Sequence, residues 1–276
     1  MDIEGIIEGL SNKVPLENNS NDYIGKDGLL HCGKCHTAKQ YRFKTMNIDR
    51  VVNCMCKCMA AEKEKERKLA DQREFERKIR EYKKMGFPEK KMQECTFENA
   101  SDSEVLNAMK KYADNFSKFK KDGKGLLLYG KVSVGKTYAA ACVVNELINK
   151  GYPCLITNFD RIKNTLQGMF EGKQEYIDSL NKFVLFVLDD LGTERTTEFE
   201  QQMMFNIIDS RYRAGLPLIV TTNLSIEEMK NPKTIEQSRI YERVLEMCFP
   251  IEVKGVNKRR MNVIKDYEET KKLLGL

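Results

Sequence analysis

The sequence contains no apolar run of about 18 residues, the length that a membrane-spanning helix needs. Its first residues, Met1–Leu10, are acidic and have no apolar core of the kind found in secretory signal peptides. These two absences exclude a membrane as a partner and argue against export. They predict a soluble, cytoplasmic protein.

A strong charge of one sign is also missing. The 276 residues include 47 Lys and Arg against 41 Asp and Glu, which gives a formal net charge of +6. So modest a basic excess permits contact with nucleic acid without requiring it. Apolar residues make up only 41% of the chain and charged residues 32%, a balance that long solvated helices produce. The length accommodates one large domain or two modest ones.

The nine cysteines do not form a pattern typical of disulfides. Five of them fall between residues 32 and 58, and the other four are scattered singly: Cys95, Cys142, Cys154 and Cys248. In a reducing compartment, clustered cysteines more often bind metal than pair with one another. We expect the scattered four to be small buried apolar side chains.

The clustered cysteines offer more than enough ligands for one tetrahedral Zn²⁺. The segment His31–His36 contains a C-x-x-C turn with a glycine, whose two thiolates converge on one metal. The segment Cys54–Cys58 reads C-x-C-x-C, and its three thiols cannot all point the same way in an extended chain. The predicted ligands are Cys32, Cys35, Cys56 and Cys58, with Cys54 as the main alternative and His36 as a more distant one.

A redox-active C-x-x-C is the rival interpretation of this cluster, but no thioredoxin-like βαβ pattern surrounds it. The region is short and polar and lacks the apolar residues for a core of its own. Bound metal would therefore supply its folding energy. We assign residues 1–60 to an N-terminal zinc-binding region, with a short helix expected at Ile3–Leu10.

A charge-dense segment follows, from Ala60 to about Lys84, and it has the composition of a solvated helix. Its apolar stripe is sparse and consists of Leu69, Phe75, Ile79 and Tyr82. Such a helix acts either as a spacer or as a surface that packs on a partner protein. The sequence Gly86-Phe-Pro88 ends it, so residues 61–88 are predicted to be a linker helix and residues 89–276 a second domain.

One motif directly indicates nucleotide binding. Gly130–Thr137 reads GKVSVGKT and matches the P-loop pattern G-x-x-x-x-G-K-(S/T), between an apolar run and a helix-forming stretch. The glycines let backbone N–H groups and a helix N-terminus surround phosphates. Lys136 would reach the β- and γ-phosphates of ATP, and Thr137 would bind Mg²⁺. The predicted nucleotide-binding residues are Gly130, Lys131, Val132, Ser133, Val134, Gly135, Lys136, Thr137 and Tyr138.

Two aspartates follow an apolar run farther along the chain, at Asp189 and Asp190. An acidic strand end of this kind completes a P-loop site. Asp189 is predicted to be the Walker B carboxylate on the Mg²⁺ side, and Asp190 the base or the group that orients water. Many related ATPases carry Glu at the second position. Because Asp is one methylene shorter and would sit farther from the water, we expect slow ATP hydrolysis.

Alternating apolar runs and helical stretches predict an α/β domain with a five-stranded, mostly parallel sheet. The expected strands are Gly125–Tyr129, Tyr152–Thr157, Phe183–Leu188, Pro217–Thr222 and Phe249–Val253. Helices are expected at Tyr138–Asn149, Thr197–Tyr212 and Thr234–Met247. Ser225-Ile-Glu-Glu228 has the form of a capping box that starts another helix.

These motifs together resemble the AAA+ helicase loaders of the DnaC/DnaI type, a group that also includes the transposition ATPase IstB. The resemblance covers roughly residues 29–260 and rests on YGKVSVGKT, FVLDDLGTE, SRYRAGLPLIVTTN and SRIYERVLEMC. The cysteine cluster leading into a charged helix resembles the phage and Gram-positive members. Asn223 resembles the sensor-1 residue, which contacts the γ-phosphate or the lytic water. The helix around Ser238 resembles the arginine-finger helix, with Arg243 as first choice and Arg239 as second.

The resemblance implies an ATP-dependent loader that places the replicative hexameric helicase on single-stranded DNA and self-associates into a spiral or ring. ATP would act as an assembly and release switch, and the N-terminal region would dock the helicase. The alternative is an IstB-like transposition ATPase that binds duplex DNA and a transposase. A third hypothesis, a zinc-dependent adaptor with a fixed ATP, is disfavoured by the complete set of catalytic residues.

Several basic residues lie where initiator-type AAA+ proteins insert a helix, but no local motif singles them out from a solvated helix face: Arg161, Lys163 and Lys173. Arg259 and Arg260 are weak candidates for contact with ATP or DNA. The chain after residue 255 is short for a full helical lid with a sensor-2 arginine.

Overall fold

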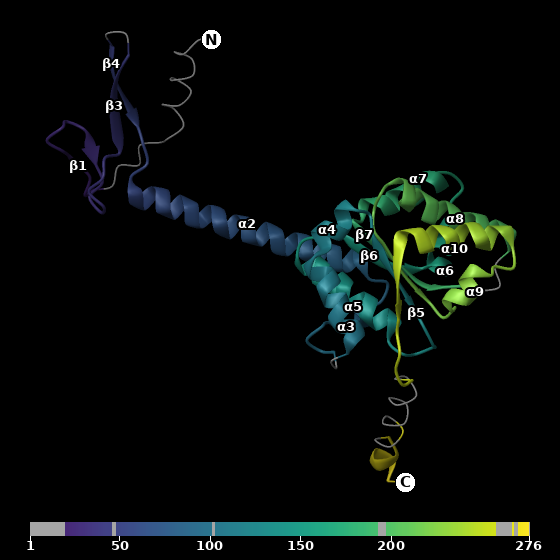
Figure 1. Ribbon diagram of the computed structural model, residues 1–276. Coiled ribbons are helices and arrows are strands. Elements are labelled where there is room, and N and C mark those ends of the chain that lie inside the picture. The colour runs from purple at the N-terminus through teal and green to yellow at the C-terminus, as the bar shows by residue number, and fades with distance from the viewer. Residues whose placement is uncertain are drawn as a thin grey trace. The chain divides into compact units, whose positions relative to one another are not determined.

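The computed structural model describes residues 20–45, 48–100, 103–192, 197–257, 267 and 270–275 (Figure 1). The chain divides into two compact units after Glu76, inside one long helix. The expected helix at Ile3–Leu10 and the candidates Arg259 and Arg260 lie outside the described residues. Among the described residues, no helix is long and apolar enough to cross a membrane.

The first unit contains two antiparallel ribbons, and its cysteines lie beside them. Strand β1 (Tyr23–Ile24) pairs with β2 (Leu30–His31), and β3 (Gln40–Thr45) pairs with β4 (Ile48–Asn53). Among the described residues before the long helix, the buried apolar side chains are only Cys32 and Cys56. The described residues of this unit therefore form no hydrophobic core in the usual sense.

The long helix α2 (Lys57–Gly86) runs from the first unit into the second. It begins three residues earlier than the expected start at Ala60, so Cys58 lies in its first turn. Of the predicted apolar stripe, Ile79 and Tyr82 pack against the core of the second unit. Leu69 and Phe75 are exposed. The stripe thus anchors the C-terminal part of the helix and leaves the middle solvated.

The second unit is built on a five-stranded sheet, in which every pair of neighbouring strands is parallel. The order is β6-β7-β8-β5-β9, with β5 in the inner position between β8 and β9. The strands are β5 (Gly125–Tyr129), β6 (Cys154–Asn158), β7 (Leu185–Leu191), β8 (Leu218–Thr222) and β9 (Cys248–Glu252). The predicted α/β sheet is confirmed, with boundaries that shift by up to three residues.

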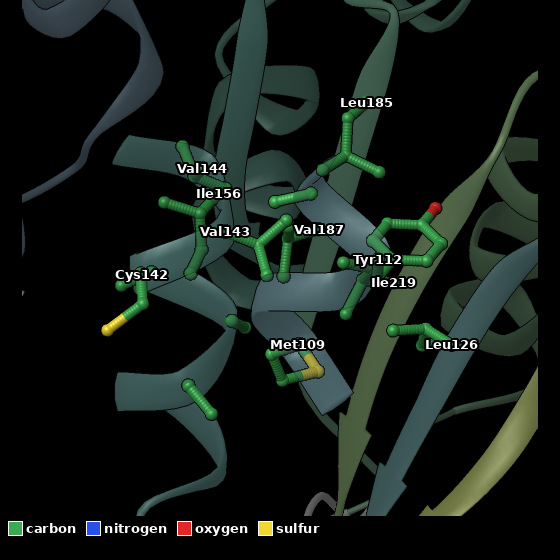
Figure 2. Close-up of a cluster of buried hydrophobic side chains, with 14 of the residues drawn as sticks. Met109, Tyr112, Leu126, Cys142, Val143, Val144, Ile156, Leu185, Val187 and Ile219 are labelled. Carbon is green, nitrogen blue, oxygen red and sulfur yellow. The ribbon is translucent and has the colours of Figure 1, made fainter. Parts of the chain in front are cut away.

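Helices cover both faces of this sheet, as side-chain alternation along buried strands requires. Leu126 and Leu128 face a core formed with α3 (Glu104–Asp114) and α5 (Lys136–Asn149) (Figure 2). Leu127 faces the opposite core, formed with α6 (Phe159–Gln167), α8 (Glu198–Arg213) and α10 (Ile235–Met247). The remaining described helices are η1 (Lys90–Glu94), α4 (Phe116–Lys121), α7 (Lys173–Ser179), η2 (Leu180–Lys182) and α9 (Ile226–Lys230).

Two capping boxes start helices on the second face. The predicted box at Ser225 and Glu228 is confirmed at the start of α9. A second box, Thr197 with Glu200, starts α8. Of the four scattered cysteines, Cys142, Cys154 and Cys248 are buried as expected. The expectation is wrong for Cys95, which is only half-buried because it lies in the segment after η1 rather than in the sheet.

Arg211 is a buried cation that holds strands β7 and β8 to helix α8. Only 1% of the residue is exposed, and its guanidinium donates to three backbone carbonyls. These are Phe183 O at 2.7 Å, Val184 O at 2.9 Å and Pro217 O at 2.8 Å. Burial lowers the pKa of Arg211 to about 10. The rigid five-donor fork of arginine fits this set of acceptors, and a lysine could not span it.

Arg211→Lys is therefore expected to destabilise the second unit by about 2–4 kcal/mol, since buried carbonyls lose their donors. Urea unfolding followed by circular dichroism measures the change. The matched control is Arg213→Lys, two residues along the same helix, where the arginine side chain is 73% exposed and pairs with Asp209. That control should stay within about 0.5 kcal/mol of the parent. Equal effects of the two substitutions would contradict the structural role of Arg211.

Candidate functional site

The P-loop joins β5 to α5 through backbone conformations that glycine allows. Gly130 has a φ of 142° and Gly135 a φ of 106°. A Cβ at Gly130 would lie 2.5 Å from the carbonyl oxygen of Val253, so a larger residue would push the loop off the neighbouring strand. Ser133 also has a positive φ, of 65°. The loop therefore turns its N–H groups inward ahead of the α5 N-terminus, which suits an anion.

Lys136 lies inside this loop, and 6% of it is exposed. Its ammonium donates to Gly130 O at 2.9 Å, to Lys131 O at 2.8 Å and to Asn223 Oδ1 at 2.7 Å. The last bond links the P-loop to the end of β8, which is the connection that a phosphate-sensing amide needs. Lys136 and Asn223, far apart in sequence, are thus brought together.

Thr137 and Asp189 also meet. The Thr137 hydroxyl lies 2.9 Å and 3.2 Å from the two carboxylate oxygens of Asp189. Burial raises the pKa of Asp189, and hydrogen bonds from Thr221 and Thr137 partly offset that rise. A bound Mg²⁺ would favour the ionised carboxylate at this position. The hydroxyl and the carboxylate are oxygen ligands of the type that Mg²⁺ takes, and they lie next to the predicted phosphate loop.

Asp190 does not follow its strand, as the sequence suggested, but lies within β7 before Leu191. It adopts a left-handed φ of 66°, and the register of β7 against β8 is irregular between Leu188 and Leu191. Asn223 Nδ2 donates to Asp190 Oδ1 at 3.3 Å. Backbone strain of this kind often occurs at functional sites, where it sets the direction of a side chain. Here Asn223 connects Lys136 to Asp190.

Thr221 is a site residue that the sequence did not single out. Its hydroxyl donates to Asp189 Oδ1 at 2.6 Å and accepts from the Asp190 backbone N–H at 2.9 Å. It is fully buried in β8. One side chain thus fixes both aspartates. In the sequence, the signal for Thr221 was a hydroxyl residue in the Thr-Thr-Asn strand end. The direction in which that hydroxyl points depends on the pairing of β7 with β8.

Thr221→Val, which keeps the shape and removes the hydroxyl, is expected to raise the Mg²⁺ concentration needed for half-maximal ATP turnover about tenfold. A lost hydrogen bond to a charged group accounts for that magnitude. Thr221→Ser should restore the parental value, because it keeps the hydroxyl. A magnesium titration of ATP turnover measures both variants. Unchanged magnesium dependence in Thr221→Val would show that Asp189 is positioned without this bond.

A cleft of about 490 Å³ opens beside the P-loop. The loop, the start of α9 and the end of β9 line it, through residues that include Val134, Asn223, Glu228 and Val253. Its size is in the range of small-molecule sites, and its lining mixes apolar walls with a few polar groups. It provides room for a nucleotide next to Lys136.

The two arginines of α10 differ in their surroundings. Arg243 lies 3.0 Å from Glu246 and 3.5 Å from Asp209, and its guanidinium stacks 4.1 Å from the centre of the Tyr212 ring. Arg239 is exposed and stacks 4.0 Å from the centre of the Phe205 ring. Neither contacts the P-loop site of its own chain in the described contacts. Arg243, the first choice from sequence, is thus engaged by two carboxylates.

The basic residues between β6 and β7 also differ in how far acidic neighbours compensate their charge. Lys163 pairs with Asp160 at 3.0 Å and Glu200 at 3.3 Å, so its charge is compensated within the unit. Arg161 lies 3.7 Å from Glu89, with both side chains largely exposed. Lys173 begins α7 and is exposed. The structure therefore gathers no basic cluster from these three residues.

In the first unit, the structure brings the predicted ligands together. One sulfur from each of Cys32, Cys35, Cys56 and Cys58 lies within 4.8 Å of the others. The Sγ–Sγ separations of 3.5 Å (Cys32–Cys58) and 3.3 Å (Cys56–Cys58) are close to the ~3.8 Å expected between thiolates on one tetrahedral Zn²⁺. Cys54 Sγ instead donates to the Ala38 carbonyl at 3.6 Å.

The surroundings of Cys32 and Cys35 favour thiolates, whereas hydrogen bonds with the three neighbouring thiols raise the pKa of Cys58 to about 12. The Thr37 hydroxyl, 3.1 Å from Cys35 Sγ, and backbone N–H groups of Cys58 and Thr37 lower the pKa of Cys35 to about 5. Backbone N–H groups of Cys35 and Lys34 lower the pKa of Cys32. Donors aimed at sulfur stabilise the charged form that metal binding requires. The residues present therefore fit a Zn²⁺ ion, and Cys32, Cys35, Cys56 and Cys58 would hold it.

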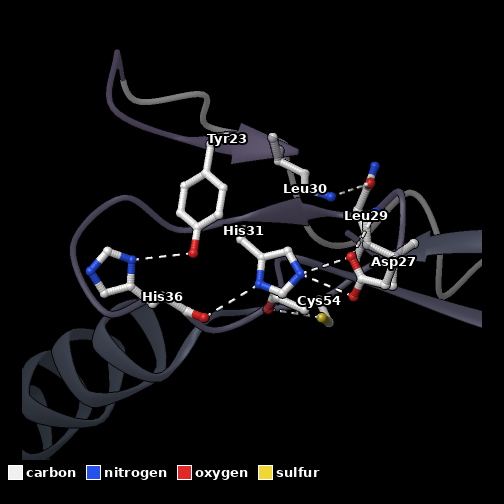
Figure 3. Close-up of polar contacts among 9 residues, drawn as sticks. Tyr23, Asp27, Leu29, Leu30, His31, His36 and Cys54 are labelled. Atoms are coloured by element: carbon white, nitrogen blue, oxygen red, sulfur yellow. Dashed lines mark hydrogen bonds and ion pairs between the residues drawn. The ribbon is translucent and has the colours of Figure 1, made fainter. Parts of the chain in front are cut away.

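Polar contacts on two sides support the cysteine knuckle, the cluster of Cys32, Cys35, Cys56 and Cys58. Lys39 and Asp22 form a buried ion pair of 2.7 Å, and Asp22 also accepts from the Gly33 N–H at 3.0 Å. On the other side, His31 lies 3.0 Å from Asp27 Oδ2 (Figure 3). His36, the distant alternative ligand, faces the Tyr23 hydroxyl at 3.2 Å instead.

The parallel sheet, the P-loop with Lys136 and Thr137, and the Asp189 strand end define an ATP-binding protein with the AAA+ fold. The comparison with protein families agrees. The chain belongs to the family of IstB-like ATP binding proteins, whose family model matches residues 47–265.

Curated relatives place the chain near two named proteins. It is 33% identical over 151 residues to "Replicative helicase loader DnaI" of Bacillus subtilis (strain 168), covering 50% of this chain and 48% of that protein. It is 27% identical over 143 residues to "Replicative helicase loader DnaC" of Escherichia coli (strain K12), covering 50% of this chain and 58% of that protein. The chain thus spans about half the length of the curated relatives it matches.

Among solved structures, the chain is similar to one titled "Crystal Structure of the DnaI". The TM-score is 0.53 at 24% sequence identity, with 62% of this chain and 96% of that chain covered. This similarity concerns the fold, and it supports the architecture described above.

Proposed function

We propose that the protein is an ATP-dependent loader that places a replicative hexameric helicase on single-stranded DNA. The observation that carries the proposal is the similarity over half of the chain to proteins named replicative helicase loaders. The linked set Lys136, Thr137, Asp189 and Asn223 supports an ATP site with a sensing group in place.

In this proposal ATP works as a switch. Lys136 and the loop N–H groups would hold the phosphates, and Thr137 and Asp189 would hold Mg²⁺. Asn223 already touches Lys136 and Asp190, so a γ-phosphate that draws Lys136 away would alter the position of both partners. Asp190 would orient the attacking water. Its short side chain, held in a left-handed backbone, supports slow hydrolysis.

Hydrolysis would be completed by an arginine from a neighbouring subunit in a spiral or ring. Arg243 is the candidate favoured by sequence, but it would have to leave Glu246 and Asp209 to reach another chain. Arg239 is exposed without such a rearrangement. Both arginines therefore remain candidates for the arginine finger, and Arg239 is the more accessible of the two. The zinc-binding unit and α2 would dock the helicase.

A transposition ATPase of the IstB type is the second candidate, because the matching family model carries that description. It would use the same ATP site with duplex DNA and a transposase. The cysteine knuckle of the first unit favours the loader, since it resembles that of phage and Gram-positive loaders.

The test is reconstitution with the replicative helicase of the same host. With ATP, the chain should co-elute with the helicase hexamer. It should also increase unwinding of a substrate built on closed circular single-stranded DNA, where unwinding requires that the helicase be loaded. Lys136→Ala should lose the ATP dependence. Recovery of a transposase, and no interaction with the helicase, would establish the second candidate instead.

A further inference from the structure

Strands β3 and β4 of the first unit form an antiparallel ribbon (Figure 1), and none of the four predicted zinc ligands lies in it. Directly paired residues of an antiparallel ribbon lie on the same face. Tyr41 pairs with Val52 and Phe43 pairs with Arg50, so these four residues share one face. The opposite face packs toward the β1–β2 ribbon, where the Gln40 side chain accepts from the Leu30 N–H at 3.0 Å.

Two aromatic rings dominate the first face. The centres of Tyr41 and Phe43 lie 6.5 Å apart, and their planes differ by 18°. Tyr41 is 62% exposed. Neither ring belongs to a hydrophobic core, since the buried apolar side chains of the described residues before α2 are Cys32 and Cys56. The sequence therefore places two nearly parallel rings on a solvated ribbon where they contribute little to folding.

The ribbon is also basic. Between Gln40 and Asn53 it carries Arg42, Lys44 and Arg50 against Asp49, three positive charges and one negative, which leaves a net charge of +2. Arg42 and Lys44 are exposed on the opposite face of the ribbon, whereas Arg50 shares the face of the two rings. Rings that offer flat faces among cations match the two parts of single-stranded nucleic acid, because bases stack on rings while phosphates attract cations. Duplex DNA keeps its bases stacked inside and would leave the rings without a role.

We propose that Tyr41 and Phe43 form a stacking site for single-stranded DNA, with Arg50 on the same face contacting its phosphates. The choice of DNA over RNA rests on the proposed loader function, whereas the stacking chemistry rests on the ribbon itself. The zinc-binding unit would then hold the strand in addition to any contact made by the ATPase unit.

The experiment uses the full zinc-loaded chain and oligothymidylate of about 20 nucleotides, labelled for fluorescence anisotropy. Replacing Tyr41 and Phe43 together by alanine should weaken binding about tenfold or more. Replacing both residues by leucine should weaken binding as much as the double alanine variant does, because leucine is apolar but offers no ring face. Replacing both by tryptophan should give binding at least as tight as that of the parent. Phe75→Ala, an exposed aromatic on α2, is the matched control and should bind as the parent does. One zinc per chain in each variant shows that the knuckle is intact.

Photocrosslinking with an oligonucleotide that contains 5-iododeoxyuridine locates the contact. Crosslinks within residues 40–53 support the proposal. Crosslinks confined to residues 77–276, equal binding by the leucine and tryptophan variants, or a preference for oligouridylate would overturn it. If the alanine variant keeps its DNA affinity but loses the helicase, the face docks protein and the proposal is wrong. Helicase binding by the parent chain tests the loader function separately, since crosslinking needs no helicase.

Discussion

Lys136→Ala is expected to lower ATP turnover by roughly two to three orders of magnitude, the effect of removing one preorganised charge from a transition state. ATP affinity should fall about tenfold or more, because a charged hydrogen-bond donor to phosphate is lost. The ammonium is already confined by Gly130 O, Lys131 O and Asn223 Oδ1, so little ordering remains to be done when the nucleotide arrives. Titration with a fluorescent ATP analogue and a phosphate-release assay measure the two effects.

The control must separate a local loss from a general loss of charge. Lys118→Ala removes the same charge from an exposed position on α4 and should leave both measurements unchanged. Because Lys136 is buried, each variant also needs a melting curve to show that the sheet is intact. Parental turnover by a folded Lys136→Ala variant would contradict the assignment of this loop as the ATP site.

The sheet and the P-loop could be predicted from sequence because their signals are local. Apolar runs of five or six residues between turn formers located all five strands, and β5 has the expected boundaries. The largest difference is β7, expected at Phe183–Leu188 and found at Leu185–Leu191. Apolar character ends at Leu188, but hydrogen bonding with β6 continues through Asp189. Hydropathy therefore underestimated a strand that continues through two aspartates to Leu191.

Contacts that depend on strand pairing could not be predicted in the same way. Thr221 contacts both Asp189 and Asp190 because β7 has one extra residue between Leu188 and Leu191 relative to β8, and no local pattern encodes that irregularity. Arg211 has the sequence environment of a surface residue on an amphipathic helix. Its burial depends on backbone carbonyls just before β7 and β8, and one of them, that of Phe183, lies 28 residues away in the chain.

The choice among the cysteines shows how one local boundary decides a site. The C-x-C-x-C spacing left Cys54 in competition with Cys56 and Cys58 because all three were considered in an extended chain. The helix α2 begins at Lys57, which places Cys58 in a helical turn and brings its sulfur 3.3 Å from that of Cys56. Cys54 remains on the end of the ribbon and faces Ala38.

Removal of zinc is expected to unfold the described residues before α2, because these residues bury only Cys32, Cys56, Lys39 and the Asp22 side chain that pairs with it. So small a core cannot offset the conformational entropy of about 40 residues. Structural zinc contributes about 10–16 kcal/mol in small domains of this kind. Hydrogen–deuterium exchange with a chelator present should show residues 29–58 losing protection, while residues 103–192 exchange as before and ATP still binds.

Single substitutions make the same prediction without a chelator and identify the ligands. Cys56→Ser should bind less than one zinc per chain and lose protection of the knuckle, because a serine hydroxyl is a poor substitute for a thiolate. Cys54→Ser, two residues away, should keep one zinc, since its side chain only donates to the Ala38 carbonyl and a hydroxyl can do the same. Both variants should keep the ATP affinity of the parent, because the second unit has its own core on both faces of the sheet. Zinc loss from Cys54→Ser, or a protected knuckle after chelation, would contradict the four-thiolate site.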